Sequence, residues 1–276
     1  MRQDSFSRIS KAKAVIRGAI CGDIIGSLYE WHRTKDYNFK LCTKFSRFTD
    51  DTVCSIAVAD AITSDIDFTR SLQKWCQKYP NAGYGGKFKR WIVSDNPTPY
   101  GSYGNGSAMR VSSAGALAAS LEECLVLAEK SASVTHNHPE GVKGAQAGAL
   151  AIFLSLEGKD KVFIRQELES RFEYDLSRDY DEIQKDYSFQ VSCQKSVPEA
   201  IIAFLISEDY ESAVRRAVAY GGDADTQAAI AGSIAAAYYG EIPETLINEC
   251  MAKLPDEMKS VIAKVDEEIE SRYGRE

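Results

Sequence analysis

The sequence predicts an all-α fold, and three observations support this. Apolar residues recur three or four positions apart in segments such as 9–20 and 117–128, the spacing that places them on one face of a helix. Other segments of helical length, such as 142–156, are rich in Ala, Gly and Leu. The alternation of β-branched and polar residues that is typical of strands is hard to find. At about a dozen residues per helix, the chain has room for roughly ten or more helices.

The predicted helices follow one another along the chain. After the first helix at 9–20, a helix over 53–62 follows an acidic motif, and leucines four apart predict the helix over 117–128. Four further helices are predicted as apolar or small-residue runs at 142–156, 201–206, 214–220 and 228–239. Clusters of Gly, Asn and Pro at 81–86 and 95–106 predict loops. The polar segment 157–197 is either a lid or a surface excursion.

The helix over 228–239 is composed mostly of alanine and other small residues. Such a helix has little side chain to pack, so its neighbours can approach it closely. We therefore expect it at the centre of a helical bundle. The motif that precedes it would then also lie near the centre.

Composition is that of a soluble globular protein, with 44% hydrophobic and 26% charged residues. We expect a single domain over residues 1–276, because no repeat, low-complexity tract or linker is apparent. The net charge of −7 argues against a nucleic-acid partner, since phosphate binding needs a basic face. We also expect a monomer.

The seven cysteines are odd in number and include no C-x-x-C pair. This argues against a disulfide framework and against a thiolate zinc site, and it favours the reducing cytoplasm. The first residues lack the apolar stretch of a signal peptide. No apolar run reaches the ~18 residues that a membrane span needs.

Two acidic motifs are the most informative features of the chain. Thr-Asp-Asp-Thr occupies 49–52 and Gly-Gly-Asp-Ala-Asp-Thr occupies 221–226, each just before a predicted helix. Each offers carboxylates beside a Thr hydroxyl, which are ligands of the kind that Mg²⁺ and Mn²⁺ prefer. If the fold brings the motifs together, they form a metal centre.

Each motif taken singly is explained more simply as a helix cap. Thr49 suits an N-cap position, and Asp50, Asp51, Asp223 and Asp225 suit the positive end of a helix dipole. The pair favours a metal site, because four carboxylates converging before buried helices would be costly without a cation.

A third acidic element lies within residues 22–30. Asp23 interrupts an apolar helix face, and we interpret it as a buried carboxylate that accepts hydrogen bonds, in preference to a metal ligand. Glu30 follows at the end of the same helix. Its simplest interpretation is a solvated helix end.

The segment 100–110 contains three glycines and an asparagine just before a predicted helix. Exposed backbone N–H groups in such a loop could cradle a diphosphate, and Tyr100 and Tyr103 could stack on a base or ribose. The alternative is a plain turn. His136 and His138 lack a third soft ligand, so we favour substrate contact or helix capping over metal ligation.

Taken together, these motifs resemble the ADP-ribosylglycohydrolase family. The matching pieces span roughly residues 15–240 and are specific only as a set: Gly22-Asp23-x-x-Gly26 with Glu30, Phe48 to Thr52, Tyr103 to Arg110, Thr135-His136, and Gly221 to Thr226. The resemblance implies an orthogonal bundle of helices that holds two Mg²⁺ or Mn²⁺ ions. The metal ligands that it implies are Thr49, Asp50, Asp51, Asp223, Asp225 and Thr226.

The resemblance also implies roles around the metals. The substrate-binding residues would be Gly101, Ser102, Tyr103, Gly104, Asn105 and His136. Glu30 would be an acidic residue near the scissile bond, and either Glu30 or a metal-binding aspartate such as Asp223 would be the catalytic acid or base. Water activated by the metals would attack as the glycosidic bond breaks.

The implied activity is removal of ADP-ribose from a modified protein side chain. Three alternatives stay open: a hydrolase of a free ADP-ribose ester or similar glycoside, a catalytically silent ADP-ribose-binding protein, and an all-α Mg²⁺-dependent phosphohydrolase. The last would not need the Gly-Asn-Gly loop or Glu30. Linkage specificity is expected to depend on the rim, at residues 30–33, 84–87 and 157–197.

Overall fold

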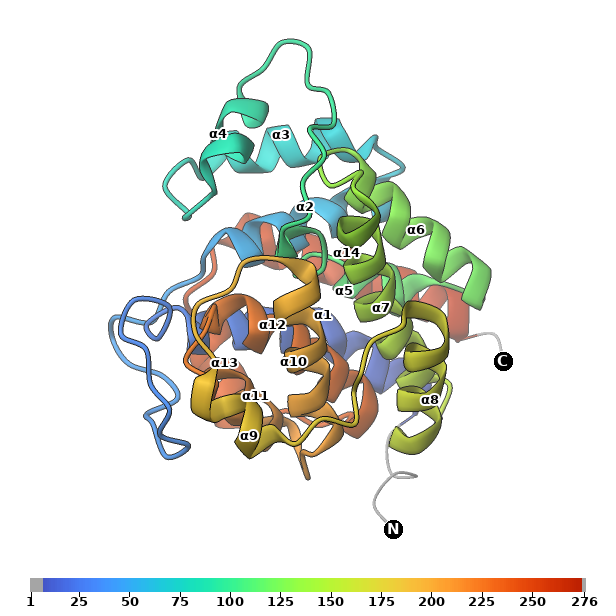
Figure 1. Cartoon of the computed structure of the whole chain (residues 1–276). Helices are drawn as coiled ribbons and strands as arrows, with labels where there is room; N and C mark the ends of the chain where they lie inside the picture. The colour runs from blue at the N-terminus through green and yellow to red at the C-terminus, as the bar shows by residue number, and fades with distance from the viewer. Residues whose placement is uncertain (1–6, 275–276) are drawn as a thin grey trace.

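The computed structural model describes residues 7–274. Within them the chain forms fourteen α-helices, one short 3₁₀ helix and no β-strand (Figure 1), which confirms the predicted all-α class. An isolated antiparallel bridge joins Gly104 to Ser192.

The helices of the first half of the chain are separated by long loops at residues 27–49 and 93–104. Their bounds are α1 (Arg8–Gly26), α2 (Asp50–Ser64), α3 (Phe68–Lys78), α4 (Gly86–Ile92), the 3₁₀ helix η1 (Asn105–Ser107), α5 (Ser112–Leu117) and α6 (Leu121–Ser133). Figure 1 shows α3 and α4 projecting together beyond α2, with the following loop returning toward the middle of the molecule.

The second half contains the longest buried helices. Their bounds are α7 (Pro139–Leu156), α8 (Lys161–Phe172), α9 (Tyr180–Asp186), α10 (Cys193–Leu205), α11 (Tyr210–Ala219), α12 (Ala224–Tyr239), α13 (Glu244–Met251) and α14 (Asp256–Tyr273). One continuous core of buried apolar residues draws on helices from α1 to α14.

Helices α1 and α12 lie against each other at the centre of the bundle. Every residue of α12 from Ala224 to Ala237 is buried, which confirms the central position predicted for this small-residue helix. The two backbones nearly touch, since a Cβ added to Gly22 would lie 2.1 Å from the carbonyl oxygen of Ala228. A Cβ on Gly26 would lie 2.5 Å from Cα of Asp225. The end of α1 therefore fixes the start of α12.

The helix predicted over 117–128 is divided in two. Helix α5 ends at Leu117 and α6 begins at Leu121. Between them, the Ser120 side chain accepts a hydrogen bond from the backbone N–H of Glu123 at 3.1 Å, as an N-cap does. The leucine spacing was correct for each helix, but it could not reveal the cap that separates them.

All seven cysteines are buried free thiols. Two sulfur pairs lie close together, Cys42 with Cys250 at 3.7 Å and Cys54 with Cys76 at 3.8 Å. Within residues 7–274, no helix is both long enough and apolar enough to cross a membrane.

Candidate active site

The first acidic motif forms the start of α2. Thr49 is its N-cap residue and accepts a hydrogen bond from the backbone N–H of Asp51 at 3.2 Å. Asp50 and Asp51 occupy the first turn, where the helix dipole favours negative charge. Asp51 is buried, and its Oδ1 has no hydrogen-bond partner among the described residues. Capping therefore explains Thr49 and leaves the carboxylate of Asp51 unexplained.

The second motif forms the start of α12 in a different way. Asp223 stands at the N-cap position, but its side chain makes no capping hydrogen bond. Instead Asp223 Oδ2 accepts a hydrogen bond from Asn105 Nδ2 at 2.7 Å. Asp225 lies in the first turn and is buried. Helix capping thus fails to account for the Asp223 side chain, which instead contacts Asn105 of the 3₁₀ helix η1.

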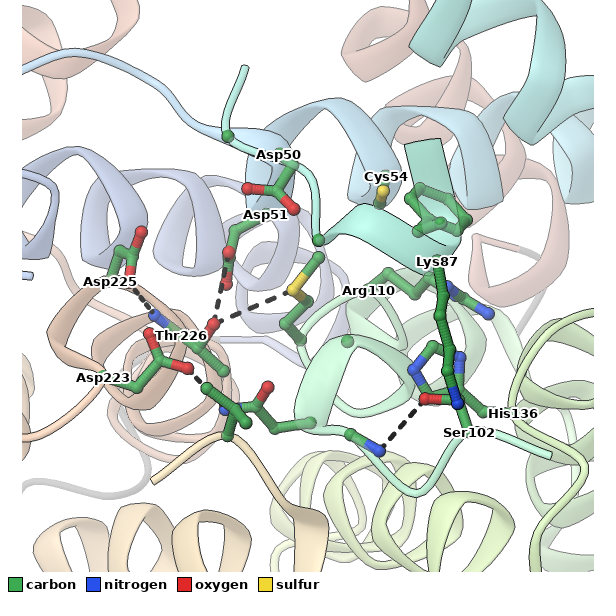
Figure 2. A pocket seen from close by; sticks show the side chains of 18 of the residues that line it. Asp50, Asp51, Cys54, Lys87, Ser102, Arg110, His136, Asp223, Asp225 and Thr226 are labelled. Atoms are coloured by element: carbon green, nitrogen blue, oxygen red, sulfur yellow. Dashed lines mark hydrogen bonds between the residues drawn. The ribbon is translucent and has the colours of Figure 1, made fainter. Parts of the chain in front are cut away.

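The fold brings the two motifs into contact. The hydroxyl of Thr226 donates a hydrogen bond to Asp51 Oδ2 at 3.2 Å, although the two residues are 175 positions apart. Carboxylate oxygens of Asp51 and Asp225 approach one another within 4.8 Å, and so do those of Asp223, Asp225 and Glu30. Figure 2 shows these aspartates converging from α2 and α12 on one space.

Asp50 lies slightly apart from the other carboxylates of the cavity. It lines the same cavity as Asp51 and Asp223, but it belongs to neither group of oxygens that lie within 4.8 Å of one another. Gly83 has a positive φ of 122° and approaches Asp50 closely, so that a Cβ there would lie 2.9 Å from Oδ1. Only glycine adopts this backbone conformation readily, which explains the loop composition beside Asp50.

Burial gives the cluster an electrostatic cost. Desolvation raises the pKa of Asp51 and of Asp225 well above the usual range, and neighbouring carboxylates raise both pKa values further. The same causes raise the pKa of Asp50 to about 8. Without a cation, such a cluster retains protons near neutral pH.

The donors present fit a hard divalent cation. They are carboxylate and hydroxyl oxygens, the ligands that Mg²⁺ and Mn²⁺ prefer. The unpartnered Oδ1 of Asp51 supplies an oxygen that nothing else in the described chain uses. A buried polar atom of this kind is rare without an ion or a water.

Asp23 has a structural role in this site. Its carboxylate accepts hydrogen bonds from the backbone N–H of Thr49 at 2.9 Å and of Thr52 at 3.1 Å, and from both threonine hydroxyls. This confirms the interpretation of Asp23 as a hydrogen-bonded buried carboxylate. Because Asp23 belongs to α1, these bonds fix the start of α2 on the central helix. An Asp23 oxygen also lies within 4.8 Å of Asp51 and Asp225.

A cavity of ≈ 430 Å³ opens over the carboxylates. Four of the six predicted substrate-binding residues line it, namely Ser102, Gly104, Asn105 and His136. The other two lie outside the lining. Gly101 donates its N–H to Asn137 Oδ1 at 2.8 Å, and Tyr103 is 52% exposed and packs edge-on against His138.

Four backbone N–H groups of the glycine-rich loop donate hydrogen bonds within the protein, mostly to acceptors outside the loop. Ser102 donates to the Thr135 carbonyl, Gly104 to the Ser102 hydroxyl, and Asn105 to the Val191 carbonyl. The N–H of Gly101 also has a partner. These four N–H groups therefore shape the loop, and a diphosphate cradle formed by other N–H groups of residues 100–110 stays a prediction.

His136 presents one nitrogen to this loop. Its Nδ1 lies 2.7 Å from the Thr135 hydroxyl, which accepts a hydrogen bond from Arg110. Burial and the Arg110 charge lower the pKa of His136 well below its usual range, so the ring is neutral. The Thr135 hydroxyl then donates to Nδ1, and the ring carries its hydrogen on Nε2, toward Gly104 and Gly106. His138 is the N-cap residue of α7. Helix capping is one of the two roles predicted for the histidines.

Part of the cavity wall comes from segments that the sequence analysis predicted as its rim. Phe189 and Val191 line the cavity, as do Lys87 and Phe88 of α4. The first two belong to the polar segment 157–197, whose end crosses the site. The Val191 carbonyl accepts from Asn105, and Cys193 N–H donates to the Tyr103 carbonyl at 2.9 Å. Lys87, Phe189 and Val191 fall within the predicted rim segments, although no local motif marks them individually, and Phe88 was missed.

The structure is thus an all-α bundle with a buried acidic cavity that offers oxygen donors. The sequence profile of the ADP-ribosylglycohydrolase family matches residues 4–275. The chain belongs to this family, whose members hydrolyse glycosidic bonds.

Individual relatives agree with this assignment. The chain is 28% identical to the human ADP-ribosylhydrolase ARH3, over 88% of this chain and 89% of that protein. It is 25% identical to the ADP-ribosyl-[dinitrogen reductase] glycohydrolase of Rhodospirillum rubrum, over 90% of this chain and 93% of that protein. A solved structure titled ADP-ribosylglycohydrolase-related protein complex superposes with a TM-score of 0.72 at 21% identity, covering 95% and 99% of the two chains. That last similarity concerns the fold alone.

Proposed function

We propose that this chain cleaves the glycosidic bond between ADP-ribose and a modified protein side chain, and that it needs divalent metal to do so. The observation that carries the proposal is the contact between Asp51 and Thr226, which unites the two acidic motifs in one cavity. The names of the human and bacterial relatives supply the substrate class.

The proposed metal ligands come from both motifs. Thr49, Asp50 and Asp51 would serve from α2, and Asp223, Asp225 and Thr226 would serve from α12, to hold two Mg²⁺ or Mn²⁺ ions. Bound metal would supply Lewis-acid chemistry, lowering the pKa of water and holding sugar hydroxyls. Thr49 is the weakest member of this set, because its hydroxyl already donates to Asp23.

Glu30 is the proposed proton donor. It lines the cavity, and burial together with the nearby charge of Asp223 raises the pKa of Glu30 above its usual range. A carboxyl whose pKa is raised is better suited to protonate the leaving group as the bond breaks through an oxocarbenium-like transition state. Asp223, fixed by Asn105, is the proposed base for the attacking water.

The wider setting completes the proposal. A single-domain, monomeric enzyme acting in the cytoplasm fits the continuous core and the seven buried thiols, which a reducing compartment keeps unpaired. The net charge of −7 disfavours nucleic acid as a partner.

One substrate panel tests the proposal. Arginine-, serine- and acetyl-linked ADP-ribose are each offered with Mg²⁺, Mn²⁺ or EDTA, and free ADP-ribose is measured. Metal-dependent release from a protein-linked substrate is expected. Release from the acetyl ester alone would show that the substrate is a free ADP-ribose ester and not a modified protein. No release from any substrate in any metal would argue that the chain binds ADP-ribose without cleaving it.

A further inference from the structure

The loop at residues 27–49, which joins α1 to α2, is basic although the chain as a whole has a net charge of −7. Its two acidic residues are outnumbered by five basic ones, namely Arg33, Lys35, Lys40, Lys44 and Arg47. Figure 1 shows the loop, in blue, projecting from one side of the bundle. A basic surface on an acidic protein attracts acidic partners and repels basic ones.

The same loop is held in shape by hydrogen bonds. The Tyr29 hydroxyl donates to the Lys40 carbonyl at 2.7 Å, which ties the two halves of the loop together. The guanidinium of Arg215, in α11, donates to the Phe39 carbonyl at 2.8 Å. Because the loop is already ordered in this way, a partner that binds to it loses less free energy to ordering.

One edge of the loop borders the cavity beside Glu30. The backbone N–H of Arg47 donates to the hydroxyl of Ser27, the C-cap residue of α1, at 3.1 Å. Residue 47 therefore returns to the segment that carries Glu30. The Arg33 guanidinium lies over the ring of Phe189, 4.8 Å from its centroid, and Phe189 lines the cavity. The loop thus places two arginines at the rim of the cavity.

These two arginines are available to a partner. Arg33 and Arg47 are both exposed, and no carboxylate of residues 7–274 lies within 4.0 Å of either guanidinium. Trp31, next to Glu30 in the chain, is 75% exposed, and Phe45 of the same loop is 69% exposed. Tryptophan and arginine side chains carry much of the binding energy in protein interfaces. The exposed residues of this loop therefore have the composition of a binding surface.

The position of Glu30 indicates which partner this surface meets. Glu30 is the proposed proton donor to the leaving group, and in the proposed reaction the leaving group is a side chain of a modified protein. The polypeptide attached to that side chain must then lie outside the cavity, close to Glu30. The nearest exposed part of the loop is the segment that contains Trp31 and Arg33.

We propose that Arg33 and Arg47, with Trp31 beside them, form a docking surface that selects polypeptide segments with acidic residues next to the ADP-ribosylated one. This inference rests on the proposed function, since it concerns the protein part of the same substrate. Carboxylates of the segment would pair with the two guanidinium groups. The surface would discriminate between modified proteins without taking part in bond cleavage.

Hydrolysis of synthetic ADP-ribosylated peptides by the full chain in Mn²⁺ tests this proposal. The peptides share one modified residue, in a linkage that the chain cleaves, and differ only in its neighbours, which are glutamate, glutamine or lysine. The modified amino acid without neighbours reports on the chemistry alone. The variants are R33Q/R47Q and R33E/R47E, with K130E as the matched control. Lys130 is an exposed lysine of α6 that does not line the cavity.

In the wild type, kcat/KM should be about tenfold higher for the glutamate peptide than for the lysine peptide, a difference that two exposed ion pairs can supply. The glutamine peptide should lie between them. The preference should vanish in R33Q/R47Q, reverse in R33E/R47E and persist in K130E. It should also shrink at about 0.5 M salt. Each ratio compares peptides within one variant, so a smaller folded fraction does not alter it.

Two results would overturn the docking surface while leaving the proposed function standing. One is a wild type that cleaves the three peptides with equal kcat/KM or favours lysine. The other is a preference for glutamate that survives in both double variants, which would locate the selection elsewhere. If the wild type releases ADP-ribose neither from the peptides nor from the modified amino acid, in any linkage, the proposed function itself fails.

Discussion

Asp225 is a single residue whose proposed role in metal binding conflicts with the folding stability of the metal-free protein. Its carboxylate is buried near Asp51 and Asp223, and these neighbours and burial raise its pKa well above the usual range. The ionised form therefore costs folding free energy unless a cation is bound.

Asp225→Asn should separate these two effects. At pH 8 the variant should lose Mn²⁺ binding by about a hundredfold or more and release no ADP-ribose, since a ligand charge is gone. In EDTA it should unfold at a higher temperature than the wild type, because folding no longer has to bury the Asp225 carboxylate or protonate it at pH 8. Calorimetric Mn²⁺ titration and thermal unfolding measure the two effects. Retained turnover would contradict the metal assignment.

Asp50 predicts a pH dependence of metal binding. Its pKa is raised to about 8, from an ordinary value of 3.8, so between these values the folded metal-free protein holds a proton that the unfolded chain releases. Stability of the metal-free protein should then fall as pH rises from about 4 to 8. Mn²⁺ must displace this proton, so its affinity should rise from pH 6 to 8 and level off above.

Proton release on Mn²⁺ binding checks this directly. Titrations at pH 7 in two buffers of different ionisation enthalpy count the protons released. The expectation is at least one, reduced in Asp50→Asn. Proton-neutral binding and a flat pH profile would show that Asp50 is already ionised.

At the scale of helices, the approach of α1 to α12 positions the site. Gly22 has no space for a side chain, because an added Cβ would meet the Ala228 carbonyl oxygen at 2.1 Å. Gly148, in the buried helix α7, differs: a Cβ there would find Val111 at 3.4 Å, an ordinary contact.

Gly22→Ala and Gly148→Ala form a matched pair. Gly22→Ala should cost about 3 kcal/mol of unfolding free energy, because two packed backbones must separate. It should also weaken the binding of Mn²⁺, because Asp23 and Asp225 lie on the two helices that would be pushed apart. Gly148→Ala should be neutral or stabilise by up to about 1 kcal/mol through helix propensity. Urea denaturation measures both, and equal stabilities would contradict the close-packing account.

The helices themselves were largely predictable from the sequence. Periodicity located α1, and small residues placed α12 at the centre, because these patterns are local. The division of α5 from α6 was missed, since one serine cap decides it. Asp23 was interpreted correctly because an isolated carboxylate on an apolar face must find donors.

The cavity was predictable only in part. The acidic motifs and His136 carry recognisable sequence patterns, and they do meet in one cavity. Lys87, Phe189 and Val191 carry none, because they reach the cavity only through the way α4 and the end of segment 157–197 fold over it. The engagement of several loop amides was equally unpredictable, because acceptors such as the Val191 carbonyl are distant in sequence.

At the scale of the whole molecule, the site is a product of the complete bundle. Its acidic residues come from segments far apart in the sequence, and Asp51 contacts Thr226 across 175 positions. One continuous core joins the helices that carry them. The central claim is therefore that the two acidic motifs share metal.

Anomalous diffraction from crystals of the full chain grown with saturating Mn²⁺ tests that claim most directly. The account predicts two Mn²⁺ peaks in the cavity, coordinated jointly by carboxylates of the α2 motif and the α12 motif, and neither peak in Asp225→Asn. The contradicting result is a cavity without Mn²⁺ in these crystals while the same preparation releases ADP-ribose in EDTA.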